Sequence, residues 1–425
     1  MNHKSRLTDS HRVVAGVALT AVALALSVAL VQRERSLGST ASEYSSPLVA
    51  LSTEPFDESA IRDRDIELYA RRIVEDKSSA IDHLTLASLL FTRSRYTGSV
   101  SDLERAESLA RESIALRTQR NFQAFELLAS VLMAQHEFGK ARSLAQRADS
   151  LDPGVPSHMV LLGEIELELG DYKAAASHFQ SVNYSGQQFT IAARLARWHE
   201  VTGRLGIARR LLQQAILKVD RRDDLPREQV AWFHYRLGEL ELRAGNIAAA
   251  DSAFRAGLAR HSSDVRVLGG LARAASARGD WKQAISFGEE AVSIQLDPAT
   301  LGTISRAYAA LGDTAQAASY ARAMSVSALT QPGVIHRAWG LFLLDHGTAQ
   351  ECATVLDRAR LELLERKDVY GHDLMAWALY RNGQLPEART EMILALSQNT
   401  QDVMLAEHAR AIGVGGETAR RLATR

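Results

Sequence analysis

The chain has 425 residues, with 50 basic and 50 acidic side chains and a formal net charge of zero. That balance argues against a general nucleic-acid-binding protein, which needs a basic face to displace counterions from phosphates. The single cysteine, Cys352, excludes an intramolecular disulfide and a thiolate metal site. Because apolar residues nowhere alternate along a run, the chain is expected to be all-α.

The first predicted element is an apolar helix over residues 13–31, preceded by a short N-terminus of residues 1–12. These 19 residues carry no charge, and a helix of that length spans about 28 Å, close to the hydrocarbon core of a bilayer. Lys4, Arg6 and Arg12 precede the run, which favours residues 1–12 in the cytoplasm and the rest of the chain outside. The run therefore predicts a single-pass anchor in the inner (cell) membrane.

A cleaved signal sequence is the competing interpretation of residues 13–31. The apolar part of a signal peptide is usually shorter, and the charged pair Arg33 and Arg35 is unusual before a cleavage site. Ser39 and Ala41 do fit a small-x-small cleavage pattern, however. Under this alternative the mature protein is periplasmic or secreted.

Residues 32–60 are predicted to be a flexible linker, because serines cluster there with two prolines and no helical stripe. Apolar residues then recur at helical spacing from Ile61 to Glu75, which suggests an N-terminal capping helix. We expect residues 61–425 to form one repeat array of about nine copies with capping helices at its ends.

The array is recognised by a glycine followed five residues later by a small residue. The pairs are Gly170/Ala175, Gly203/Ala208, Gly245/Ala250, Gly279/Ala284, Gly312/Ala317, Gly347/Cys352 and Gly383/Ala388. The glycines are 33, 42, 34, 33, 35 and 36 residues apart, a period typical of stacked helix-turn-helix units. The 42-residue step contains a charged insert, residues 220–226, which is expected to lengthen one loop and is a candidate break between two halves of the array.

Each repeat position has a mechanical role. The glycine ends the first helix in a left-handed conformation. A polar residue that follows it is expected to cap the second helix; these residues are Asp171, Asn246, Asp280 and Asp313. The small residue lies where the two helices cross, and a larger apolar residue such as Phe179 or Phe254 follows four residues later.

This pattern resembles the tetratricopeptide-repeat (TPR) family. The copy from Met159 to Phe179 carries the family's small residue, turn glycine and helix-B alanine, and the preceding copy has His136 where the glycine would stand. The resemblance implies a right-handed α-solenoid. It also implies a protein-interaction scaffold whose inner groove is lined by the outward positions of each first helix.

Carried onto this sequence, those groove positions predict a partner-binding surface. Its candidate residues are Arg197, Trp232, Tyr235, Arg273, Arg306 and Arg337. Arginine binds carboxylates bidentately and aromatic side chains give rigid contact area, so the expected partner is a protein or peptide segment with acidic groups. The alternative is a solvated charged face that pairs with the chain's own Glu239.

No catalytic, cofactor-binding or metal-binding motif is found. The histidines show no zinc-protease spacing, and no nucleophile elbow or phosphate-binding loop is present. We therefore expect no enzyme activity and no cofactor. The favoured function is a membrane-anchored scaffold, an assembly factor for an envelope complex. A soluble extracytoplasmic adaptor, or an enzyme that uses the array as a platform, are the alternatives.

Overall fold

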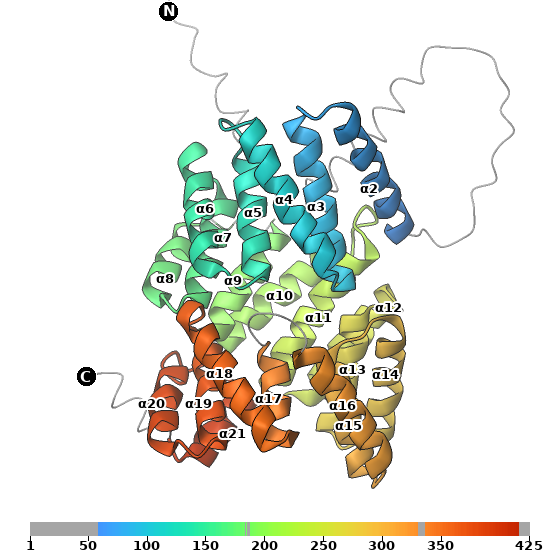
Figure 1. The fold of residues 1–425 in the computed structure, drawn as a ribbon, viewed down its shortest axis with the longest axis vertical. Helices are drawn as coiled ribbons and strands as arrows, with labels where there is room; N and C mark the ends of the chain where they lie inside the picture. Colours follow the sequence, from blue (N-terminus) through green and yellow to red (C-terminus); the bar gives the residue numbers. More distant parts are fainter. Residues whose placement is uncertain (1–57, 183, 185–187, 330–335, 416–425) are drawn as a thin grey trace, which may run out of the picture. The chain divides into compact units, whose positions relative to one another are not determined.

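A computed structural model describes residues 58–182, 184, 188–329 and 336–415. The predicted N-terminal segment 1–12, the predicted membrane segment 13–31 and nearly all of the predicted linker 32–60 lie outside the described residues. Among the helices that are described, none combines the length and apolar character that crossing a bilayer requires. The described part is all-α, as expected, and its helices are shown in Figure 1.

The chain divides into two compact units, residues 1–162 and 163–425, and the boundary falls inside helix α7. The helices up to this boundary are α2 (Glu58–Glu75), α3 (Ala80–Thr97), α4 (Val100–Leu116), α5 (Phe122–Ala134), α6 (Phe138–Leu151) and α7 (Pro156–Glu168). Within the first unit α3 packs on α4, and α5 packs on α6, as antiparallel hairpins.

The second unit continues the hairpins. Its helices after α7 are α8 (Tyr172–Ser181), α9 (Phe189–Val201), α10 (Leu205–Val219), α11 (Arg227–Arg243), α12 (Ile247–Arg260), α13 (Val265–Ala277), α14 (Trp281–Ile294), α15 (Pro298–Ala310), α16 (Thr314–Leu329), α17 (Arg337–His346), α18 (Ala349–Glu365), α19 (Val369–Arg381), α20 (Leu385–Ala395) and α21 (Val403–Ile412). From α9 onward, each first helix packs on its own second helix and on the next hairpin, which is the packing of a helical solenoid. The charged insert 220–226 lies between α10 and α11 and lengthens that loop, as predicted. It is not the break between two halves of the array, because the units divide after residue 162 and the insert lies within the second unit.

The turn residues follow the predicted backbone with one exception. Six of the seven repeat glycines have φ between 72° and 84°, in the left-handed region. His136, which replaces a glycine, adopts the same region with φ 63°. Gly347 is the exception: its φ is −80° and its ψ 174°, because helix α17 ends in an extended residue and α18 starts with a capping box at Thr348.

Small residues let the helices approach, as the repeat pattern predicts. Ala175, Ala208 and Ala250 are completely buried. The ring of Phe254 fills the space beside two glycines, since a Cβ added at Gly238 or Gly270 would lie 2.4 Å or 2.5 Å from it. Phe254 therefore fills a space that glycine leaves both in its own first helix and in the following one.

Most predicted helix caps are confirmed. The side chains of Asp171, Asp280 and Asp313 accept hydrogen bonds from the backbone N–H groups of residues three positions later. The prediction for Asn246 is wrong, because its amide donates a hydrogen bond to Glu241 at 2.8 Å instead of capping α12. Cys352 is buried, with Sγ 3.7 Å from the carbonyl oxygen of Leu343, and burial raises its thiol pKa.

Candidate partner-binding site of the second unit

The predicted groove arginines of the second unit are joined through the chain's own carboxylates. Glu200 of α9 lies between three arginines: Arg197, Arg236 and Arg243, whose guanidinium nitrogens are 3.3–3.4 Å from its oxygens. Arg243 also approaches Glu239 at 3.4 Å. The ion pairs therefore run continuously from α9 to α11.

The same chain of ion pairs reaches α13. Glu239 accepts a hydrogen bond from Arg273 at 2.5 Å. Tyr235 lies beside this pair, since the charges of Glu239 and Arg273 act on its hydroxyl. Arg273 therefore matches the second interpretation of the sequence, in which the charged face pairs with the chain's own Glu239.

Tyr370 of α19 connects this network to the C-terminal hairpins. The guanidinium carbons of Arg197 and Arg337 lie 5.1 Å and 4.9 Å from the centre of its ring, within the range of cation–π attraction. Arg337 also donates to Asp373 from Nε at 2.9 Å, and His408 contacts the other oxygen of Asp373 at 2.8 Å. We call the five arginines 197, 236, 243, 273 and 337, with Glu200, Glu239, Asp373 and Tyr370, the arginine network.

The electrostatics of the network favour charged carboxylates. Glu200 is only 6% exposed, and burial alone raises its pKa, but the charges of Arg243, Arg197 and Arg236 outweigh burial and lower the pKa to about 2. Burial also opposes ionisation of Glu239 and Asp373, yet their arginine partners keep both pKa values low. Burial raises the pKa of Tyr370 to about 12, so its hydroxyl stays protonated.

The remaining predicted groove residues lie outside the arginine network. Trp232 is half-buried and packs edge-on against Phe233, with ring centres 4.9 Å apart. Arg306 of α15 is exposed and makes no hydrogen bond or ion pair with the described residues. Partial desolvation lowers its pKa, and the nearby charge of Asp345 opposes this.

Five members of the network are absent from the predicted binding surface: Glu200, Arg236, Arg243, Tyr370 and Asp373. The first three lie off the groove positions that the family pattern marks. Arg243 and Glu200 left a usable signal, because Arg243 follows Glu239 by four residues and Glu200 follows Arg197 by three, each on one helix face. The contacts of Arg236 and Arg243 with Glu200 depend on how consecutive repeats are rotated.

The second unit also closes on itself. The backbone N–H of Lys367 donates to the carbonyl oxygen of Glu168 at 3.0 Å, and the N–H of Val369 donates to the hydroxyl of Tyr172 at 2.8 Å. Further along, the hydroxyl of Thr400 donates to the carbonyl oxygen of Val201. The C-terminal repeats thus contact the first repeats of the same unit.

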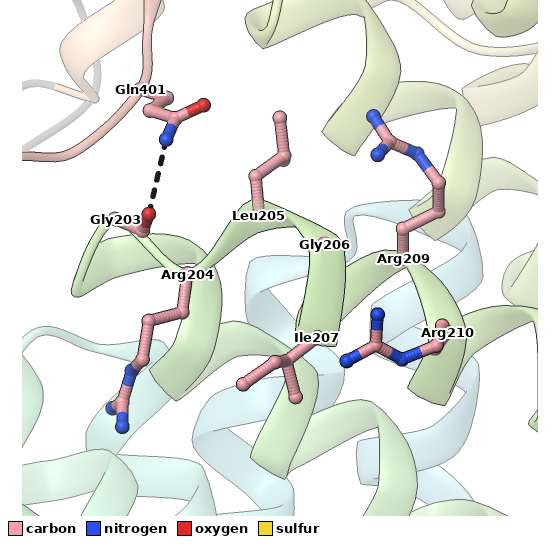
Figure 2. Close-up of a pocket in the computed structure, with 8 residues that line it drawn as sticks. All are labelled: Gly203, Arg204, Leu205, Gly206, Ile207, Arg209, Arg210 and Gln401. Carbon is pink, nitrogen blue, oxygen red and sulfur yellow. Dashed lines mark hydrogen bonds between the residues drawn. The ribbon is translucent and has the colours of Figure 1, made fainter.

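A pocket of about 400 Å³ lies beside this closure (Figure 2). Its lining residues are Gly203, Arg204, Leu205, Gly206, Ile207, Arg209, Arg210 and Gln401. Gln401 donates from Nε2 to the carbonyl oxygen of Gly203 at 3.1 Å, the dashed line in Figure 2. Within the described residues no group of three or more histidine, cysteine or acidic side chains is arranged to hold a metal ion.

Comparison with known proteins supports the repeat assignment. A family profile described as tetratricopeptide repeat matches residues 127–187 and 235–299. No curated protein matches the sequence.

Similar solved structures share little sequence with this chain. A crystal structure of the APC/C heterotetramer Cut9–Hcn1 aligns at 17% identity and a TM-score of 0.49, covering 84% of this chain and 59% of that one. PilW, titled a type IV pilus biogenesis factor, aligns at 16% identity and a TM-score of 0.42, covering 50% and 96%. The pilF protein of Pseudomonas aeruginosa aligns at 14% identity and a TM-score of 0.40, covering 53% and 97%. The profile match identifies tetratricopeptide repeats over residues 127–187 and 235–299, and the helical hairpins of the described residues agree with it.

Proposed function

We propose that this chain is a protein-interaction scaffold whose second unit receives an acidic segment of a partner protein at the arginine network. The observation that carries the proposal is the concentration of guanidinium groups. Five arginines surround three carboxylates of the network, and a fourth carboxylate, Asp402, acts on Arg243 and Arg337. Exposed Arg306 adds a further positive charge that has no ion-pair partner among the described residues.

Arg306 is the natural first contact for such a partner. Arg306 is an exposed residue with no ion-pair partner among the described residues, whereas Arg197, Arg273 and Arg337 already pair with carboxylates of the chain. An acidic segment can pair with Arg306 without competition, whereas at the arginine network it must compete with Glu200, Glu239 or Asp373. Charged contacts of this kind set specificity and association rate more than affinity.

The binding proposal is tested with the full-length chain and a fluorescein-labelled, glutamate-rich peptide. Arg306→Glu is expected to raise the Kd about tenfold, which is a loss of about 1.4 kcal/mol. Arg322→Glu, a charge reversal at another exposed arginine on α16, is the matched control and should leave the Kd unchanged. Equal binding by the wild-type chain and Arg306→Glu would reject Arg306 as the first contact, and no binding at all would reject an acidic partner.

The scaffold is proposed to be anchored in the inner membrane by residues 13–31, with the repeats outside the cytoplasm, where it would assist assembly of an envelope complex. The uncharged run and the three basic residues before it support this orientation. Carbonate washing of membranes should leave the protein in the pellet, and protease added outside the inner membrane should digest the repeats. Release by carbonate favours the soluble adaptor instead.

A further inference from the structure

The contacts that close the second unit involve two short segments, residues 366–371 and 398–403, which we call the closing segments. They contact the turn after α7 and the turn after α9. Besides the hydrogen bonds already described, Arg366 pairs with Glu168 at 3.0 Å, and Val403 lies against Gly245 in the next turn. The hydrogen bonds join residues that are almost 200 positions apart in the chain: 197 for Tyr172 and Val369, and 199 for Val201 and Thr400.

Glycine makes this close approach possible at two turns. A Cβ added at Gly170 would lie 2.2 Å from the carbonyl oxygen of Lys367, and one added at Gly203 would lie 2.5 Å from that of Asn399. Both obstructing atoms belong to the backbone, so a side chain at either turn must displace the closing segment. Gly312 also forms the left-handed turn after the first helix of its repeat, with φ 84°, but a Cβ added there would meet no atom within 4 Å.

The closing segments are continuous with the arginine network. Tyr370, which is 4% exposed and lies between Arg197 and Arg337, belongs to the first segment. Asp402, whose charge acts on Arg243 and Arg337, belongs to the second. Moving these segments away therefore removes the aromatic ring that covers Arg197 and one carboxylate that offsets the arginine charge.

We infer that the closing segments act as an intramolecular gate that controls access to the arginine network. With the contacts formed, Arg197 is covered by Tyr370 and paired with Glu200. With them released, Arg197 is exposed to a partner and the network carries a larger net positive charge. Because an acidic segment binds the open form better, partner binding and gate closure oppose each other. The acidic partner in this inference rests on the proposed function, whereas the gate itself does not depend on it.

The gate is tested without any partner by chemical modification of arginine. The full-length chain is treated with phenylglyoxal, and the modification rate of each arginine is followed by peptide mass mapping. Gly203→Ala is expected to raise the rate at Arg197 and Arg337 about tenfold, in proportion to the open population. Exposed Arg306 serves as the internal reference, and its rate should not change.

Gly312→Ala is the matched control, because it imposes the same left-handed backbone on alanine without meeting the closing segments. Thr400→Val is a milder second variant that removes only the hydrogen bond to Val201 and keeps the turn glycines. Circular dichroism at the working temperature shows that each variant is folded. The gate would be overturned if phenylglyoxal modified Arg197 at the same rate in the wild-type chain, in Gly203→Ala and in Thr400→Val.

The glutamate-rich peptide separates the gate from the proposed function. If both are right, Gly203→Ala and Thr400→Val bind the peptide more tightly than Gly312→Ala does. Faster modification of Arg197 without any peptide binding supports the gate and rejects the acidic partner. Peptide binding that is equal in all variants, with unchanged modification, rejects the gate and leaves the acidic partner supported.

Discussion

The two units of the chain differ in how far apart in sequence their contacting residues lie. In the first unit the polar contacts join neighbouring helices, as when Ser113 donates to the carbonyl oxygen of Ala80, 33 residues away. In the second unit the same neighbour contacts are present, but Tyr172 and Val369 also meet across 197 residues. A solenoid needs only the first kind of contact, because each repeat is stabilised by its neighbours.

The difference implies that the units lose structure differently. Where repeats contact only their neighbours, a local defect disturbs the adjacent hairpins and spreads weakly. Where the ends of an array also contact each other, a defect in the middle removes support from both ends. The second unit should therefore respond to mutation as a whole, and the first unit hairpin by hairpin.

The largest expected effect comes from the core of the second unit. Phe254→Ala removes a fully buried ring that fills the space beside Gly238 and Gly270, at a cost of about 3–5 kcal/mol. Hydrogen exchange should then lose protection throughout the second unit, including α19 and α21. Leu128→Ala, a comparable truncation in the first unit, should affect only α5 and its neighbours. Unchanged protection in α19 and α21 after Phe254→Ala would erase the distinction between the units.

A smaller effect is expected on acidification of the arginine network. The Glu200 pKa is lowered from an ordinary value near 4.5 to about 2, so its carboxylate contributes about 3 kcal/mol above pH 4.5. Because the folded-state pKa is the lower one, this contribution is lost as the pH falls from 4.5 toward 2. Urea denaturation between pH 6 and pH 2.5, followed by exchange in α9 and α11, measures the loss.

Two variants define the origin of that pH dependence. Glu200→Gln should destabilise the second unit at pH 6, because several buried guanidinium groups lose a carboxylate, and it should flatten the acid slope. Glu290→Gln, an exposed change on α14, should alter neither. If the free energy of unfolding of Glu200→Gln still falls as steeply on acidification, another carboxylate must be responsible for the pH dependence.

The smallest effect concerns the irregular turn of the first unit. His136 holds a left-handed backbone, which costs a non-glycine residue about 1 kcal/mol. His136→Gly is therefore expected to stabilise the α5–α6 hairpin by about 0.5 kcal/mol, after the ring contact with Phe138 is lost. The reverse change, Gly383→His in the second unit, should cost about 1 kcal/mol. A lower Tm for His136→Gly would mean that the ring contact outweighs the backbone strain.

Much of the fold was predictable because the repeat positions act locally. The turn glycines, the small residues at the helix crossings and the aspartate caps each depend on residues within one hairpin. Asn246 failed as a predicted cap because Glu241 offers its amide a better partner. Gly347 failed as a left-handed turn because Thr348 starts the next helix with its own capping box.

The candidate site was predictable only in part. Three of the selected groove residues, Arg197, Arg273 and Arg337, belong to the arginine network, because helix periodicity puts them on equivalent faces of their repeats. The pattern did not distinguish exposed Arg306 from arginines already bound to carboxylates. Pairing depends on carboxylates that other helices contribute.

The sequence by itself determined the helical hairpins, their packing residues and most of their turns, because a period of about 34 residues repeats the same short-range contacts. Only the tertiary structure decided that the second unit closes on itself and that the five arginines of the network pair with carboxylates of the same chain. The physical reason is cumulative rotation. Each repeat turns slightly relative to the last, so residues 168–203 and 366–403 meet only after several such rotations have added up.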